Sequence, residues 1–399
     1  MSRRPDDRVR EALRYAAAPG ESQAEARSWA VVREAFVERE RQAPPMRLRA
    51  RAAIALAVGA VAAIVALTPA GADVREWIAD AIEGEEDARP ALGSLPAPGS
   101  VLTESRDGVW IVRDDGSRRR LGDYRHATWS PNGLFVAAAE GRELLALTTQ
   151  GEQRWAITAP AGIESLDWSS DDGFRVAYVA GRELRVVAGD GTSDVGVRNR
   201  VGSEAIAWQP ESDPSRAIHR LAFVDGVDRV TLTDTDSGDV LWRSAPIGAP
   251  VRSLQWTTDG KRLLVTGDGF GHLLAADGRP ALKAVAPGAT AATLSPAGEA
   301  LAVVRPRARG GSELSLVPTA PAARPKVLYP TRADATGTFG APTFSPDGSW
   351  VLLPWPDADQ WLFIRVADGR VVPVGDVSRQ LDADRRGADA FPVVAGWCC

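Results

Sequence analysis

The sequence has few of the residues that build metal and thiol chemistry. Among its 399 residues there are two Cys, adjacent at the very end as Cys398 and Cys399, and three His, far apart at His126, His219 and His272. A Cys/His zinc site takes about four such ligands, usually in closely spaced pairs. The sequence offers almost nothing from which to assemble one, and we expect no metal or other cofactor.

The common catalytic motifs are also missing. The chain has no Gly-x-Ser-x-Gly elbow, no P-loop, no His-Glu-x-x-His and no Gly-x-Gly-x-x-Gly on a strand–helix turn. Carboxylates are abundant, so a glycosidase-type pair in a central channel, and with it a hydrolase, stays open as one alternative. The net charge of −5 and the pI near 5.5 indicate no nucleic-acid partner.

What the sequence does contain is an internal repeat. A large apolar residue, a polar turn and an apolar strand recur in that order at spacings of 38 to 50 residues. The clearest copies read Trp129-Ser-Pro-Asn-Gly, Trp256-Thr-Thr-Asp-Gly, Leu294-Ser-Pro-Ala-Gly and Phe344-Ser-Pro-Asp-Gly, and the others begin at Trp168 and Trp208. Pro fixes φ in the turn, and Asn-Gly or Asp-Gly tolerates the positive φ that returns the chain antiparallel. This period predicts four-stranded propeller blades.

The two ends of the repeat region complement each other. Residues 101–122 contain the last three strands of a unit without its first strand, and Phe391 to Trp397 reads as that missing strand. Pairing them would close the ring and remove an unpaired sheet edge. We therefore predict an all-β, seven-bladed propeller over residues 101–399, with six blades as the fallback.

The Trp-Ser-Pro-Asn/Asp-Gly turn followed by an apolar strand resembles the TolB-like and WD-repeat propeller repeats over about residues 101–397. The resemblance implies a propeller that binds or scaffolds proteins, although the fold also hosts receptors and enzymes. We expect the repeated large residues to fill the space between blades rather than a ligand surface. They are Trp129, Trp168, Trp208, Trp256, Leu294, Phe344 and Trp397.

Residues 52–72 form an uncharged, apolar run. As a helix it would be about 30 Å long, which matches the hydrocarbon core of a bilayer. Arg47, Arg49 and Arg51 precede it, whereas acidic residues follow it, so we expect a single membrane span with the N-terminus cytoplasmic and the propeller outside. A cleaved signal peptide ending near Ala70-Gly71-Ala72 and a buried core helix are the alternatives.

The segments on either side of the span are short. Residues 1–51 predict cytoplasmic helices, in which Trp29, Val32, Phe36 and Val37 form an apolar stripe that either packs within a helical hairpin or binds a cytoplasmic protein. Residues 73–100 predict a juxtamembrane helix followed by an acidic, Pro- and Gly-containing linker.

Two further features have competing interpretations. Asp234, Asp236 and Asp239 alternate as in a calcium loop, but Asp, Ser and Gly are also the ordinary residues of a blade turn, and no bidentate Glu follows. Cys398 and Cys399 would face an oxidising space in the predicted topology; an intermolecular bond, free thiols and a frayed terminus all stay open.

The sequence therefore leads to three functional readings. The first is a membrane-anchored extracytoplasmic propeller that binds or senses a protein partner on one propeller face. The second is a transmembrane signalling regulator, similar in layout to anti-sigma-like proteins but without their His-x-x-x-Cys-x-x-Cys signature. The third is the hydrolase mentioned above.

Overall fold

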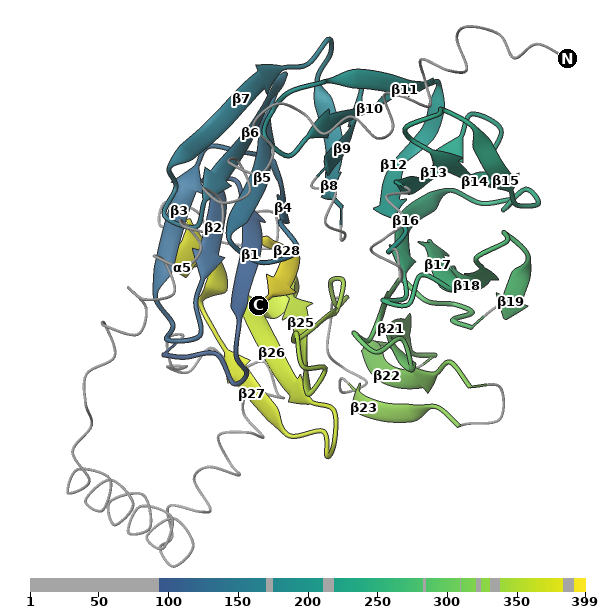
Figure 1. The fold of residues 1–399 in the computed structure, drawn as a ribbon. Helices are drawn as coiled ribbons and strands as arrows, with labels where there is room; N and C mark the ends of the chain where they lie inside the picture. The colour runs from purple at the N-terminus through teal and green to yellow at the C-terminus, as the bar shows by residue number, and fades with distance from the viewer. Residues whose placement is uncertain are drawn as a thin grey trace, which may run out of the picture. The chain divides into compact units, whose positions relative to one another are not determined.

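The computed structural model describes residues 93–169, 175–210, 219–282, 285–308, 310–320, 324–330, 338–382 and 391–399. These residues form seven four-stranded antiparallel sheets, which stand around a common centre as the blades of a propeller (Figure 1). The predicted seven-bladed all-β fold is confirmed. No helix of the described part of the chain is long and apolar enough to cross a membrane, and the predicted span at 52–72 lies outside that part.

The blades are numbered here from the one that contains both ends of the described chain. Blade 1 contains β28 (Val393–Cys398), β1 (Ser100–Ser105), β2 (Gly108–Val112) and β3 (Arg118–Gly122). Blade 2 contains β4 (His126–Trp129), β5 (Phe135–Glu140), β6 (Glu143–Thr148) and β7 (Gln153–Thr158). Blade 3 contains β8 (Ile163–Trp168), β9 (Arg175–Ala180), β10 (Glu183–Ala188) and β11 (Val195–Asn199). Blade 4 contains β12 (Val201–Trp208), β13 (Arg220–Asp225), β14 (Val230–Asp234) and β15 (Val240–Arg243).

The remaining blades follow the same order from the centre outwards. Blade 5 contains β16 (Val251–Trp256), β17 (Arg262–Gly267), β18 (Phe270–Ala275) and β19 (Pro280–Leu282). Blade 6 contains β20 (Ala291–Leu294), β21 (Ala300–Pro306), β22 (Ser312–Pro318) and β23 (Lys326–Pro330). Blade 7 contains β24 (Thr343–Phe344), β25 (Trp350–Trp355), β26 (Gln360–Arg365) and β27 (Val371–Val374). A short 3-10 helix η1 (Pro356–Ala358) connects β25 to β26, and the helix α5 (Val377–Leu381) follows β27.

The repeated turn forms because its polar side chains bond the local backbone. In blade 7, Asp347 Oδ1 accepts hydrogen bonds from the Ser345 hydroxyl at 2.6 Å and from the Ser349 backbone N–H at 3.0 Å. Gly348 then takes a φ of +70°, in the left-handed region that favours glycine. The turn reverses the chain directly from β24 into β25.

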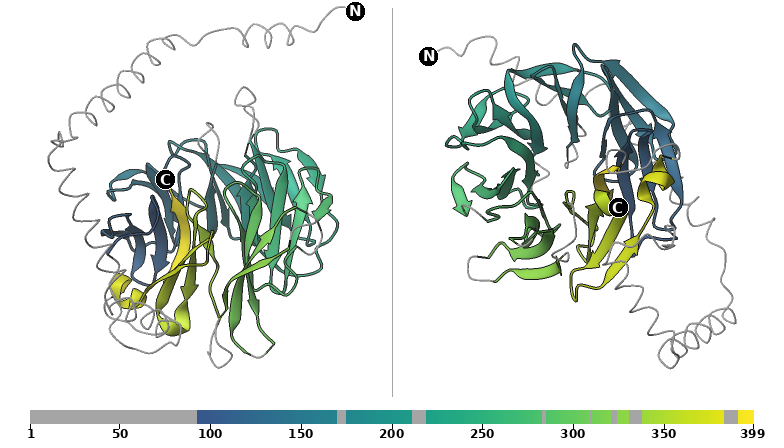
Figure 2. Two further views of the ribbon diagram at one scale, coloured as in Figure 1. Left: turned by 90° about the horizontal axis from the view of Figure 1, so that it is seen from below. Right: turned by 180° about the vertical axis from the view of Figure 1, so that it is seen from behind.

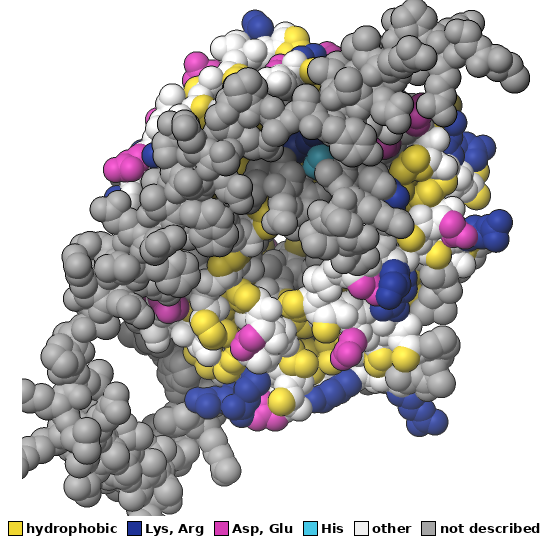
Figure 3. All heavy atoms as spheres, viewed as in Figure 1, with side chains coloured by type: hydrophobic (Ala, Val, Ile, Leu, Met, Phe, Trp, Pro, Cys, Tyr) yellow, Lys and Arg dark blue, Asp and Glu magenta, His cyan; other side chains and the backbone are white. Residues whose placement is uncertain are grey.

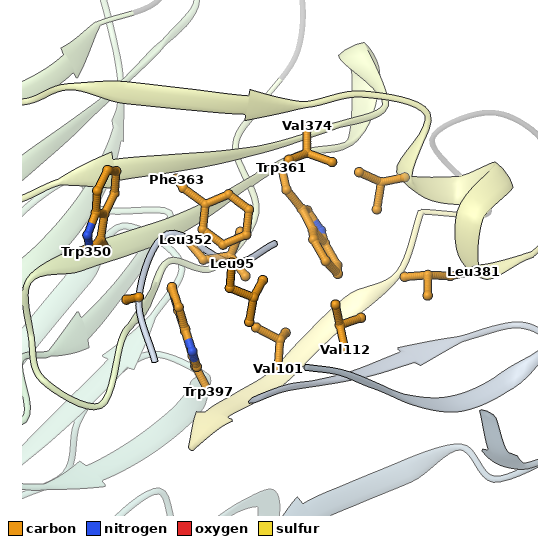
Figure 4. Packing of buried hydrophobic residues seen from close by; sticks show 12 residues of the cluster. Leu95, Val101, Val112, Trp350, Leu352, Trp361, Phe363, Val374, Leu381 and Trp397 are labelled. Carbon is orange, nitrogen blue, oxygen red and sulfur yellow. The ribbon is translucent and has the colours of Figure 1, made fainter. Parts of the chain in front are cut away.

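The hydrophobic core lies between neighbouring blades. Strands such as β25 are buried at every position, as expected for sheets covered on both faces. At the junction of blades 7 and 1, Trp361 and Phe363 of β26 pack with Val112 of β2 and with Trp397 of β28 (Figure 4). Each large apolar side chain buried in this way contributes about 1.5–3 kcal/mol.

The ring closes through both ends of the propeller. Strand β28 pairs antiparallel with β1, in a register that places Cys398 opposite Ser100 and Trp397 opposite Val101. This is the closure predicted from the complementary ends of the repeat region. The views in Figure 2 show β28 lying within blade 1, beside the strands that begin the propeller.

The propeller begins slightly earlier than the repeat indicates. Leu95 and Ala97, which the sequence analysis assigns to the linker, are 7% and 6% exposed and pack in the core between blades 7 and 1. The Leu95 backbone N–H donates to the Asp114 carbonyl at 2.8 Å. The chain therefore enters the ring beside the turn that joins β2 to β3.

Candidate functional site

The residues predicted to fill the space between blades lie at or near the ends of the innermost strands. Six of them are between 3% and 7% exposed, and Trp129 is half-buried. Each packs with the preceding blade: Trp256 contacts the cluster of Ala205 and Ala222 in blade 4, and Phe344 that of Ala302 and Leu314 in blade 6. The same holds for Trp129, Trp168, Trp208, Leu294 and Trp397.

Some of these tryptophans also make a hydrogen bond to the preceding blade. The Trp208 indole Nε1 donates to the Asp167 carbonyl at 3.1 Å, and Trp256 Nε1 donates to the Ala207 carbonyl at 3.3 Å. In both cases the acceptor is the residue just before the tryptophan that ends the previous innermost strand. The buried Nε1 atoms of Trp129, Trp168 and Trp397 have no such partner among the described residues.

The innermost strands enclose a cavity in the channel of the ring. Its volume is about 560 Å³, within the range of ligand pockets. It is lined by strands β4, β8, β12 and β16, and among its polar lining residues are Glu104, His126, Ser165, Asp167, Gln255 and Thr258. A second cavity of about 560 Å³ shares Gln255 and Ala395 with the first and continues past Thr293, Ser345 and the two terminal cysteines.

Side chains facing this channel join neighbouring blades by accepting backbone hydrogen bonds. Glu104 Oε1 accepts from the Ala127 N–H at 2.7 Å, and Asp167 Oδ2 accepts from the Trp208 N–H at 3.1 Å. Gln255 Oε1 accepts from the Leu294 N–H at 2.8 Å. The sequence analysis did not identify these acceptors. The available signal was weak: Asp167 and Gln255 each precede the repeated tryptophan directly.

The two acidic acceptors are desolvated. Burial raises the pKa of Glu104 to about 7, against a smaller lowering by the hydrogen bond from Ala127. Burial likewise raises the pKa of Asp167 to about 6, against the lowering by its backbone hydrogen bonds. Both carboxyl groups therefore change charge near neutral pH. Burial lowers the pKa of His126, and the charges of Glu204, Glu140 and Glu164 oppose that shift.

The described residues that line either channel cavity include no Lys or Arg. Basic side chains lie elsewhere: in Figure 3, Lys and Arg are found mainly towards the periphery of the face, interspersed with Asp and Glu. A separate hollow of about 350 Å³ on blades 3 to 5 is lined by side chains of both signs, Glu164, Arg182, Glu204 and Arg252. The described lining of the channel cavity thus contains two acidic residues, Glu104 and Asp167, and one basic residue, His126.

The Asp234 loop has the contacts of a hairpin turn. Asp234 Oδ1 accepts from the backbone N–H groups of Asp236 and Ser237, at 2.8 and 3.2 Å. Asp236 instead pairs with Arg175 of the preceding blade at 2.5 Å and with His219 Nδ1, directly before β13 in its own blade, at 2.7 Å. Asp239 lies in the same turn, where its carbonyl accepts a hydrogen bond from the Asp234 backbone N–H at 2.9 Å. The described residues contain no group of three or more side chains placed to hold a metal ion.

The terminal cysteines line the second cavity. Their sulfur atoms are bonded to each other, which is none of the three states that the sequence analysis leaves open. Cys398 belongs to β28, and Cys399 packs on Gly133 in the turn of blade 2. The predicted stripe of Trp29, Val32, Phe36 and Val37 lies outside the described residues.

Comparison with known proteins identifies the fold. No protein-family model and no curated protein matches the chain. Among solved structures, the C-terminal WD40 domain of Sif2 has a TM-score of 0.52 at 12% identity, over 73% of this chain and 87% of that one. The Cps50 (Swd1) β-propeller domain of Myceliophteria thermophila has a TM-score of 0.49 at 17% identity, over 63% and 86%. Kuenenia stuttgartiensis hydrazine synthase has a TM-score of 0.48 at 12% identity, over 69% and 84%.

The similarity to the Sif2 domain agrees with the seven sheets of this chain and shows a WD40-like propeller architecture.

Proposed function

We propose that this protein is a membrane-tethered, extracytoplasmic propeller that binds a protein partner at its channel. The observation that carries the proposal is the channel cavity of about 560 Å³, whose described lining comes mainly from the innermost strands. A site on paired strands is rigid, and a rigid site loses little conformational entropy when a partner binds. The WD40-like propeller architecture supports a protein as the class of partner.

The tether rests on the sequence. The uncharged run at 52–72, with arginines before it and acidic residues after it, favours a single span with the propeller outside. Reporter fusions after Ser100 test this topology. A periplasmic-type phosphatase reporter should be active there, and activity of a reporter that works only in the cytoplasm would contradict the proposal.

Partner binding is best tested by site-specific photo-crosslinking in the full chain. A benzophenone amino acid in place of Thr258, an exposed residue at the cavity, should form a discrete adduct with one protein. The same substitution at Leu241, which is 45% exposed on the outer strand β15, is the matched control. Equal labelling at both positions, or no adduct at Thr258, would reject the channel as the binding site.

A second candidate function is transmembrane signalling, in which occupancy of the propeller alters the cytoplasmic segment. The observation that favours it is the stripe of Trp29, Val32, Phe36 and Val37, which is large for a segment of 51 residues to bury alone. Replacing Trp29 and Phe36 by Ala should abolish capture of a defined cytoplasmic protein without affecting membrane insertion. Capture that survives both substitutions would leave only the tethered binding function.

A further inference from the structure

The outermost strand of blade 1 is more basic than that of any other blade. Strand β3 begins at Arg118 and reads Arg-Arg-Arg-Leu-Gly, and its three arginines are exposed. Among the seven outermost strands of the described blades, no other contains more than one Lys or Arg. The concentration of positive charge is therefore a property of this blade and not of the repeat.

Two of these arginines have no counter-charge. Arg118 donates to the carbonyl and the side-chain oxygen of Gln380, at 3.2 and 2.9 Å, and Arg119 donates to the Gln150 carbonyl at 3.3 Å. These acceptors are neutral, and neither arginine forms an ion pair in the described part of the chain. Successive side chains of a strand point to opposite faces, so an uncompensated guanidinium lies on each face of β3.

Strand β3 also has a free edge. It pairs with β2 only, because blade 1 is ordered β28-β1-β2-β3, and it lies on the outside of the ring (Figure 1). The backbone groups on its outer side therefore have no strand partner among the described residues. A further segment can add to such an edge through backbone hydrogen bonds, while its alternating side chains meet those of the strand.

The chain enters the propeller beside the start of this strand. The Leu95 N–H donates to the Asp114 carbonyl, in the turn that leads into β3. Upstream, residues 76–87 contain six acidic residues and no basic one, and the last three, 85–87, form an uninterrupted acidic run. The intervening residues 88–94 can span about 23 Å, which exceeds the length of β3, about 17 Å. The acidic run is thus tethered within reach of the arginines at a high effective concentration.

We infer that residues 85–87 add to the free edge of β3 as a short fifth strand of blade 1. An antiparallel direction gives the shortest connection, because the end of the run must lead back to Leu95 beside the start of β3. Opposite charges then face each other on both faces of the sheet. The facing pairs are Asp87 with Arg118, Glu86 with Arg119 and Glu85 with Arg120.

The docked run has two consequences. It covers an edge that would otherwise be open to pairing with other chains. It also leaves residues 73–84, rather than 73–94, as the chain that joins the propeller to the predicted span. The second consequence rests on the proposed tether, whereas the docking itself depends on neither the tether nor the partner.

The test is hydrogen exchange measured by mass spectrometry on the full chain in nonionic detergent. We expect the amides of residues 85–87 to exchange at least about tenfold more slowly than those of an unstructured chain of the same sequence. The triple variant Glu85→Gln, Glu86→Gln, Asp87→Asn should lose this protection. The matched control Glu76→Gln, Asp80→Asn, Glu83→Gln removes as many charges from the same segment outside the run, and should keep it.

Charge reversal identifies the strand that the run meets. Glu86→Arg should abolish the protection, because two guanidinium groups would face each other, and adding Arg119→Glu should restore it. Arg154→Glu is the matched control, because Arg154 is likewise exposed on an outermost strand, β7 of blade 2. Adding it to Glu86→Arg should restore nothing.

Rapid exchange of residues 85–87 in the unaltered protein would overturn the inference, as would a failure of Arg119→Glu to restore protection beyond Arg154→Glu. Anionic lipid is the other occupant that suits an arginine-rich edge, so the measurement is repeated in micelles that contain phosphatidylglycerol. Protection of β3 that requires this lipid and persists in the triple variant would assign the edge to lipid headgroups and reject the inference. The topology judged by the reporter fusion after Ser100 is independent of all these results.

Discussion

The hydrogen bond from Trp208 to the preceding blade allows a direct measurement of how much one such bond between blades contributes to the stability of the propeller. Replacing Trp208 by Phe removes part of the ring and also the indole donor to the Asp167 carbonyl at 3.1 Å. Replacing Trp168 by Phe removes the same atoms from a residue that is equally buried, at 6% exposed against 4%, but whose indole N–H has no partner among the described residues. The difference between the two variants therefore isolates the hydrogen bond.

The magnitude follows from ordinary energetics. Both variants lose similar packing energy, and Trp208→Phe should lose in addition about 0.5–1.5 kcal/mol for the hydrogen bond. For a domain of about 300 residues that is a further drop of about 1–2 °C in melting temperature. Trp256→Phe, whose donor lies 3.3 Å from the Ala207 carbonyl, should fall between them. Calorimetric melting of the full chain measures all three. A Trp168→Phe variant at least as destabilised as Trp208→Phe would refute the assignment.

Three further predictions concern charge, turns and closure. Burial raises the pKa of Glu104 in the folded protein to about 7 from 4.5, so the stability that this carboxyl contributes is present in acid and is lost as the pH rises through that range. The free energy of unfolding of Glu104→Gln, relative to that of the unaltered protein, should therefore rise by about 2–3 kcal/mol between pH 4.5 and 7.5. A difference between the two proteins that does not change with pH would contradict this. Gly278→Ala should lower the denaturant midpoint of unfolding much more than Gly269→Ala does. Gly278 and Gly269 have similar φ values, +80° and +84°, but only at Gly278 would the new Cβ lie 2.4 Å from the Trp242 ring. Similar midpoints for the two variants would show that this contact is unimportant. Deleting residues 393–399 should expose β1 as a free edge and cause concentration-dependent association in light scattering, whereas a monodisperse variant would show that closure by β28 is dispensable.

The architecture was predictable because each blade repeats its turn chemistry locally. The Pro and Asp-Gly pattern at Phe344 to Gly348 specifies the reversal between β24 and β25 without reference to the rest of the chain. The missing first strand of the opening unit, supplied by the segment ending at Trp397, then determined both the number of blades and their closure.

The site was far less predictable, because it depends on how blades face one another. The sequence shows that Asp167 precedes Trp168, but not that its carboxyl reaches the Trp208 N–H of the next blade. Glu104 lies in a strand with no tryptophan at its end, and its contact with Ala127 arises only from the rotation between blades 1 and 2. The burial of Leu95 is similarly a product of tertiary packing, since its neighbours read as a polar linker.

The pairing of β28 with β1 also sets the order in which this protein can mature. The ribosome makes β1 near the start of the propeller and β28 within its last seven residues, so more than 280 residues of synthesis separate the two partners. During that interval blades can form one after another as they emerge, but blade 1 lacks its innermost strand. The inner edge of β1 therefore stays unpaired until β28 has been synthesised, so the ring becomes complete only after all the other blades have been made.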